Sequence, residues 1–170
     1  MTHLDDMPYT NAFMTEMLRI RIPGPLGLAH RAMEATKLMG YDIPKDTQVI
    51  TNFWAVHHDP KIWGDPEEFR PERFLDADGK FVKPTHLVAF SMGSRYCMGE
   101  SIARMEFFIF VVVMLQRYHL LLARDDSPPI NEECLRSGQF LVPPSHEMRV
   151  KERFSREKSI MEYNQQMWDD

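Results

Sequence analysis

The chain has 170 residues, of which 44% are hydrophobic and 26% charged, and these values are typical of one ordinary globular domain. Its formal net charge is −5, from 25 acidic and 20 basic residues without a long run of one sign, so no nucleic-acid-binding surface is predicted. The two cysteines, Cys97 and Cys134, form no CxxC pair, which argues against a disulfide framework or a zinc ribbon and favours a reducing, cytosol-facing setting.

The first predicted element is a helix that begins near Pro8 and runs to about Ile22, where a Pro-Gly-Pro sequence ends it. The residues before it are polar and acidic, so they do not resemble a signal peptide. Apolar residues at helical spacing make one stripe, formed by Phe13, Met17 and Ile20. Glu16 lies within that stripe, and we therefore expect its carboxylate to be buried.

Residues 26–56 contain short apolar runs broken by turn residues, a pattern that predicts a small antiparallel sheet. His57 and His58 follow directly. Adjacent side chains on a strand point to opposite faces, so these two histidines are poor joint metal ligands and we interpret them as structural. Residues 57–90 are rich in Pro, Asp and Gly, and short helical turns are expected around Pro66–Phe69. A segment of this length without regular structure is often functional.

A long helix is predicted from Gly99 to about Leu122. It is apolar on nearly every side, so it needs cover from other elements or leaves an exposed patch. Its apolar run over 107–115 is shorter than the roughly 20 residues that cross a bilayer. Residues 137–150 read as a hairpin around two prolines, and the charged tail 151–170 as loose chain or a frayed helix.

The strongest local signal is a glycine-punctuated loop that starts at Phe90 and ends in Cys97 directly before the long helix. Backbone N–H groups and the helix dipole at such a position favour the thiolate over the thiol. Gly93 and Gly99 allow the backbone to pass close to a flat partner, and Arg95 offers a guanidinium suited to a carboxylate. Taken alone, a cysteine near a helix start is more often a small buried hydrophobe.

Three further patterns accompany this loop. Glu16-x-x-Arg19 is either a surface ion pair or a buried pair, and its position on the apolar stripe favours the buried, well hydrogen-bonded alternative. Arg73 lies in a Pro-Glu-Arg-Phe segment that reads as a solvated turn or as the source of a second guanidinium for Glu16. The aromatic, His and Pro positions over 52–69 have no simple periodic explanation.

In this order and at this spacing, the motifs resemble those of the cytochrome P-450 family across about Leu4 to Val150. The sequence between the motifs is similar to that of the family's eukaryotic microsomal group. The resemblance implies a mainly α fold with small antiparallel β-sheets (α+β), the C-terminal portion of the cytochrome P-450 fold. Residues 1–150 would form a partial cytochrome P-450 domain and 151–170 a polar tail. By this resemblance the chain is a fragment without the membrane anchor and the distal helix, and is not expected to be a competent enzyme alone.

The resemblance also implies roles for single residues. Cys97 matches the axial thiolate of haem b, a ligand that favours O–O cleavage, and Phe90 matches the aromatic ring that shields the sulfur. Gly99 completes the loop. Arg95 matches a partner of a haem propionate, and His30 matches either a second propionate partner or a satisfied strand histidine.

The resemblance implies roles for two further groups of residues. The buried charge triad that locks the loop before the cysteine corresponds to Glu16, Arg19 and Arg73. The walls of the substrate pocket correspond to Leu28, Ala29 and Phe140, flanked by Leu26, Gly27, Gln139 and Leu141.

The implied activity is a monooxygenase that inserts one oxygen atom from O₂ into a small lipophilic substrate, with electrons from an NADPH-dependent flavoprotein reductase. The parent enzyme would sit at the endoplasmic reticulum membrane, held only through an N-terminal anchor missing here. A noncatalytic interaction fragment, which occupies the reductase or a full-length partner, is the alternative. A redox-sensing or zinc-binding module built on Cys97 and Cys134 is a third hypothesis.

Overall fold

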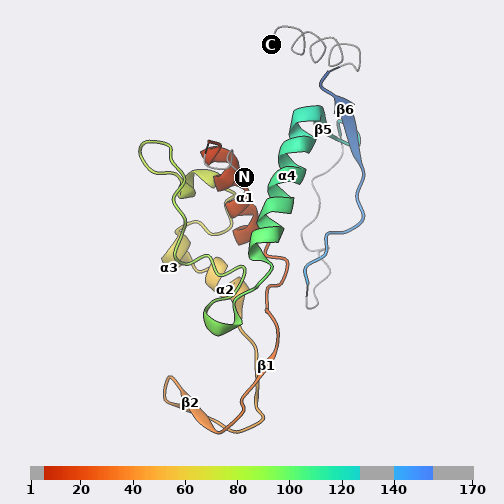
Figure 1. Ribbon diagram of the computed structural model, residues 1–170. Coiled ribbons are helices and arrows are strands. Elements are labelled where there is room, and N and C mark those ends of the chain that lie inside the picture. Colours follow the sequence, from red (N-terminus) through yellow and green to blue (C-terminus); the bar gives the residue numbers. More distant parts are fainter. Residues whose placement is uncertain (1–5, 127–139, 155–170) are drawn as a thin grey trace, which may run out of the picture.

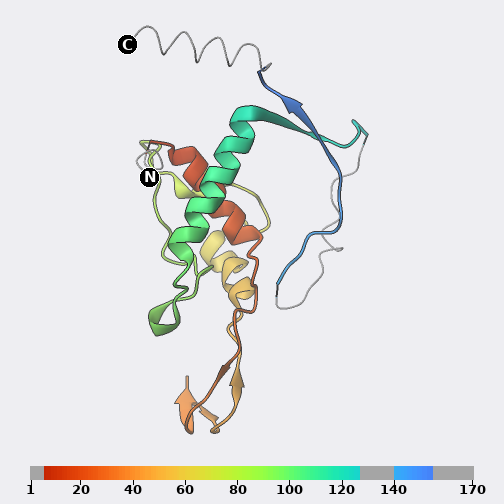
Figure 2. The same ribbon diagram turned by 45° about the vertical axis from the view of Figure 1, so that its right-hand side comes forward.

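The computed structural model describes residues 6–126 and 140–154 of the chain. Helices α1 and α4 lie side by side and form the body of the molecule, with α2 and α3 packed below α1 (Figures 1 and 2). The helical elements are α1 (Pro8–Ile20), α2 (Phe53–His57), α3 (Pro60–Trp63) and α4 (Glu100–Arg117), with 3₁₀ turns η1 (Pro71–Phe74) and η2 (Gly93–Arg95). The strands are β1 (His30–Arg31), β2 (Thr36–Leu38), β3 (Tyr41–Ile43), β4 (Gln48–Val49), β5 (Tyr118–Leu122) and β6 (Met148–Glu152). The predicted fold class, mainly α with small antiparallel sheets, is confirmed.

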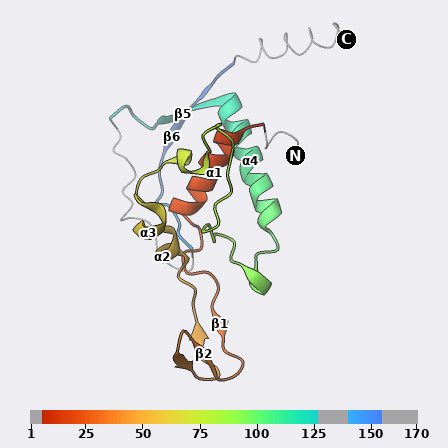
Figure 3. The same cartoon turned by 90° about the vertical axis from the view of Figure 1, so that its left-hand side faces the viewer.

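Two strand pairs form an arm that projects away from the helices (Figure 3). In the pair β1–β4, His30 stands opposite Val49, and β2 pairs separately with β3. The prediction of one small sheet over residues 26–56 is therefore wrong in part, because the pairs are separate and Phe53–His57 is helical. The side chain of Asn52 accepts a hydrogen bond from the backbone N–H of Ala55 at 3.0 Å, and this cap starts the helix.

Helix α1 begins with proline at its first position, where the missing N–H costs nothing. Its buried face is more polar than the predicted stripe, because Ala12, Thr15, Glu16 and Arg19 are at most 1% exposed while Met17 is 37% exposed. The apolar pattern alone did not predict this face. Polar side chains are buried here because they satisfy one another, as described below.

Two small apolar clusters form the core, one that includes Trp63 of α3 and one that includes Phe53 of α2. The first joins Ala12, Trp63 and Phe74. The second joins Ile22, Phe53 and Val88. The helical elements of this region are α3 and η1, and the short helical turns predicted around Pro66–Phe69 are reduced to one hydrogen-bonded turn at 66–67. Proline at the first turn of both α3 and η1 explains where these elements begin.

The long helix α4 ends at Arg117, and the residues predicted to complete it form strand β5. Strand β6 pairs with β5, with Leu120 opposite Val150, so the hairpin predicted around the two prolines is not found among the described residues. Its residues 137–139 lie outside the described ranges. Lys151 and Glu152, the first residues of the predicted tail, continue β6, whereas 155–170 lie outside the described ranges.

The exposed apolar face predicted for α4 is present: Ile102, Ile109 and Phe110 are each more than half exposed. The only residue of α4 buried among the described residues is Glu100. No helix within 6–126 and 140–154 is long and apolar enough to cross a membrane.

Candidate functional site

A buried charge cluster holds α1 against η1. Both oxygens of Glu16 face Arg19, with Nε 2.7 Å from Oε2 and Nη2 2.8 Å from Oε1. Glu16 Oε1 also accepts hydrogen bonds from the backbone N–H of Arg70 at 2.9 Å and from Nε of Arg73 at 3.2 Å. The side chains of Glu16 and Arg19 are fully buried and that of Arg73 is 7% exposed. The predicted meeting of these three side chains is thus present in the fold.

The electrostatics of the cluster favour the ionised carboxylate. Burial by itself raises the pKa of Glu16, but the hydrogen bonds from Arg19 and Arg70 and the charges of Arg19 and Arg73 outweigh it. The net result is a pKa below the ordinary value of 4.5. Arg19 also lies over the ring of Trp63, 5.2 Å from its centroid. The cluster therefore stays charged at neutral pH.

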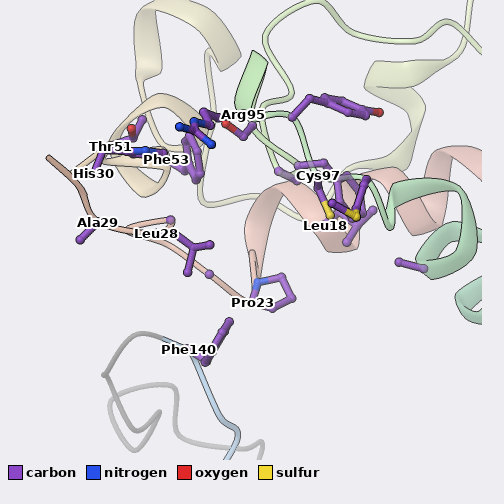
Figure 4. A pocket seen from close by; sticks show the side chains of 18 of the residues that line it. Leu18, Pro23, Leu28, Ala29, His30, Thr51, Phe53, Arg95, Cys97 and Phe140 are labelled. Atoms are coloured by element: carbon purple, nitrogen blue, oxygen red, sulfur yellow. The ribbon is translucent and has the colours of Figure 1, made fainter. Parts of the chain in front are cut away.

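A pocket of about 1230 Å³ lies between the end of α1, the chain leading into β1, and the loop that carries Cys97. It exceeds the roughly 300–1,000 Å³ of ordinary small-molecule pockets. Most of its wall is apolar. Figure 4 shows Cys97 across this pocket from His30 and Thr51, with Pro23 and Phe140 along another edge. Segments far apart in the sequence thus line one large, open pocket.

Charge around the pocket is of one sign. No Asp or Glu of the described ranges lines the pocket. Five basic residues do, namely Arg21, His30, Arg31, Arg95 and Arg104. The guanidinium of Arg95 takes part in no ion pair within the described part of the chain. Such a lining suits a large apolar ligand that carries carboxylates.

The loop before α4 presents a free, exposed thiol to the pocket. The backbone N–H of Cys97 donates to the carbonyl of Phe90 at 2.9 Å, which closes the loop. Ser91 and Gly93 both have positive φ, 65° and 67°, and these left-handed residues make the turns that bring the two ends together. A Cβ at Gly99 would lie 3.8 Å from the Cys97 sulfur. The backbone there passes close to the thiol.

The structure brings most of the sequence-predicted site residues to this pocket. Its lining includes eight of them: Gly27, Leu28, Ala29, His30, Phe90, Arg95, Cys97 and Phe140. His30 lies both in strand β1 and at the pocket, so its two sequence interpretations coincide in position. Gly99 is the N-terminal cap residue of α4 and does not line the pocket. Glu16, Arg19 and Arg73 form their own cluster outside it.

The sequence interpretation missed one residue near the site and misplaced another. Arg104 lies over the ring of Phe90, 5.2 Å from its centroid, and its Nε is 2.6 Å from Oε1 of Glu100. The i, i+4 spacing of Glu100 and Arg104 is a signal that could have identified the pair. His57 ends helix α2 and is fully buried, which corrects its predicted place on a strand.

The metal alternatives concern His57, His58 and the two cysteines. His57 and His58 sit at the end of a helix, and no group of three or more His, Cys, Asp or Glu side chains within 6–126 and 140–154 is arranged to hold a metal ion. Cys134 lies outside the described residues.

Comparison with known proteins places these features in a family. The family model for cytochrome P-450 matches residues 1–149. Cytochrome P-450 2U1 of Homo sapiens is 39% identical over 153 residues, which are 90% of this chain and 28% of that protein. Cytochrome P-450 2L1 of Panulirus argus is 47% identical over 151 residues, 89% of this chain and 30% of the relative. The male-specific cytochrome P-450 2C13 of Rattus norvegicus is 43% identical over 143 residues, 84% of this chain and 29% of the relative. The chain therefore spans less than a third of the length of these curated relatives.

Proposed function

Because the chain belongs to the cytochrome P-450 family, we propose that its pocket holds haem b with Cys97 as the thiolate ligand of the iron. The observation that carries this proposal is the free thiol of Cys97, exposed in a large apolar pocket that basic residues line without a carboxylate among the described ones. When bound, a haem with a thiolate ligand supplies the electron density that favours cleavage of the O–O bond.

The residues present fit such a group. Arg95 and His30 would pair with the two propionates, since both line the pocket and Arg95 is in no ion pair within the described ranges. Phe90 lines the same cavity and would shield the sulfur from water. Gly99 completes the loop close to the thiol, where an added Cβ would make an ordinary contact with the sulfur at 3.8 Å.

The charge cluster would hold the backbone that leads to the Cys97 loop in one arrangement. Glu16, Arg19 and Arg73 are buried and mutually satisfied, and a satisfied polar network holds the elements that it joins in one arrangement. In this proposal the cluster touches neither the haem nor the substrate and acts through the backbone.

The activity proposed for the whole enzyme is a monooxygenase reaction on a small lipophilic substrate, with electrons from an NADPH-dependent flavoprotein reductase at the endoplasmic reticulum membrane. Leu28, Ala29 and Phe140 are apolar and line the pocket, so they would form part of the substrate wall. Turnover is assigned to the whole enzyme, because the chain spans less than a third of its relatives.

The test is spectroscopic and uses the 170-residue chain. It is refolded with haem, reduced and exposed to carbon monoxide, and the red-shifted Soret band of a thiolate complex is expected. C97S removes the sulfur and is expected to abolish the band. C134S changes the other cysteine of the sequence and is the matched control, expected to keep it. A band that survives in C97S, or its absence in the parent chain, would contradict the proposal.

The exposed face of α4 favours a second candidate, a noncatalytic fragment that binds the reductase or a full-length partner. Ile102, Ile109 and Phe110 form an apolar surface of the kind that marks interaction sites. Size-exclusion chromatography and pull-down with purified reductase test it. A monomer that retains no reductase argues against this alternative.

A further inference from the structure

His57 joins the charge cluster to the segment that leads to Cys97. It is the last residue of α2 and is 0% exposed. Its backbone carbonyl accepts a hydrogen bond from Nη1 of Arg19 at 2.8 Å, and its ring Nε2 accepts one from the backbone N–H of Val88 at 3.0 Å. His57 therefore accepts one hydrogen bond from a residue 38 positions earlier in the chain and one from a residue 31 positions later.

The hydrogen bond to Val88 fixes the tautomer of the ring. A backbone N–H only donates, so Nε2 must be the unprotonated nitrogen, and the proton of the neutral ring is on Nδ1. Nδ1 is buried and has no hydrogen-bond partner among the described residues. An apolar side chain of similar size would avoid that unpaired N–H. What the imidazole supplies, and an apolar side chain does not, is the acceptor for Val88.

From Val88 the chain of contacts continues to the thiol. The backbone N–H of Ser91 donates to the carbonyl of Val88 at 2.9 Å, and that of Cys97 donates to the carbonyl of Phe90 at the same distance. Val88 is also 8% exposed and packs in the second apolar cluster. The segment from Val88 to Cys97 is thus held at Val88 by apolar packing and by the hydrogen bond to His57.

We propose that His57 is a positioning residue, which transmits the rigidity of the Glu16–Arg19 pair to the Cys97 loop through the acceptor Nε2. The inference rests on the proposed function in one respect, that the loop serves a haem ligand. Burial, and the positive charges of Arg19 and then His58, lower the pKa of His57 to about 4. The ring is therefore neutral, and Nε2 remains an acceptor, throughout the physiological range.

The test compares two substitutions of His57. H57Q places an amide oxygen as many bonds from the backbone as Nε2 and keeps an acceptor, whereas H57L fills similar space without one. Amide hydrogen exchange is measured on the haem-free 170-residue chain. In H57L the protection of the Val88 amide is expected to fall at least about tenfold, with smaller losses at Ser91 and Cys97. H57Q is expected to keep protection within about threefold.

The matched control is H58L. His58 is the next residue and its ring stacks on Trp54 with 3.7 Å between centroids, but Val88 donates to the ring of His57. H58L is expected to leave the Val88 amide unchanged. Equal losses in H57L and H57Q, or no loss in either, would overturn the proposal, because the acceptor would then not matter.

A second readout separates this proposal from the haem proposal. After refolding with haem, the red-shifted Soret band of the reduced carbon monoxide complex is expected to weaken in H57L and recover in H57Q. If exchange at Val88 responds as expected while no variant, including the parent, gives the band, then the haem proposal fails and the positioning role stands. If the band forms equally in all variants and exchange is unchanged, then the positioning role fails alone.

Discussion

Replacement of Glu16 by glutamine tests the charge cluster most directly. The substitution keeps the size of the side chain, removes its charge and turns one of its two acceptor oxygens into a donor that faces an arginine. Glu16 accepts four hydrogen bonds, two from Arg19 and one each from Arg70 and Arg73. Arg19 is fully buried and cannot lose its proton, so its charge remains without a counterion. Loss of one partner of a buried pair costs about 3–5 kcal/mol.

The assay is urea denaturation of the 170-residue chain, followed by circular dichroism. D42N is the matched control, because Asp42 pairs with Lys37 at 2.9 Å and both side chains are at least 70% exposed. An exposed pair contributes at most about 1 kcal/mol. E16Q is therefore expected to lower the unfolding free energy several times more than D42N. Equal effects of the two substitutions would refute the argument that burial makes this pair important.

The same variant has a signature in pH. The pKa of Glu16 is lowered in the folded state, so the unfolded state binds the proton first and the stabilisation is fully present above the ordinary pKa of 4.5. It is lost as the pH falls from there through the lowered folded value. E16Q cannot titrate, and its unfolding free energy is expected to fall less steeply below pH 4.5.

Three other predictions concern the elements around the thiol loop. G27A is expected to cost about 1–3 kcal/mol, because Gly27 has φ +58° and an added Cβ would lie 2.8 Å from the ring of Phe53. G79A, at φ +75° with no atom within 4 Å, carries the backbone strain alone and separates the two causes in urea titrations. N52A removes the cap of α2 and is expected to cost about 1 kcal/mol, measured in the same way. The pKa of His57 falls from 6.5 to about 4 on folding, so the unfolded state binds the proton first as the pH falls. Calorimetry is expected to show up to about 3 kcal/mol of unfolding free energy lost between pH 6.5 and 4. H57Q has no imidazole, so its unfolding free energy is expected to change less over this range.

Local patterns were enough to predict much of this molecule. Proline before an apolar stripe predicted where α1 begins, and turn residues predicted strands in the arm. The i, i+3 spacing of Glu16 and Arg19 predicted a buried pair, because a buried charge needs an opposite charge, although the buried face is not the predicted stripe. These predictions depend on neighbours within one or two turns, which the sequence shows directly.

Contacts between distant segments account for the misses. Leu120, Leu121 and Leu122 favour a helix by local preference, yet they lie in β5, which pairs with residues almost thirty positions later. Met17 is exposed to the pocket because the polar side chains of α1 occupy the buried face. The spacing of apolar residues in α1 and in β5 does not indicate which distant residues these segments contact. Tertiary pairing overrides local preference at both places.

The position of the thiol depends on polar contacts more than on a large apolar core. The two apolar clusters each have only three buried residues, and α4, the helix after Cys97, buries no apolar side chain among the described residues. The loop is instead reached through Arg19, the backbone and ring of His57, and Val88. Hydrogen bonds are directional, so such a path fixes where a backbone lies more sharply than apolar contact does. In the proposed role of His57, the buried Glu16 on α1 thereby bears on the position of Cys97, although it does not line the pocket.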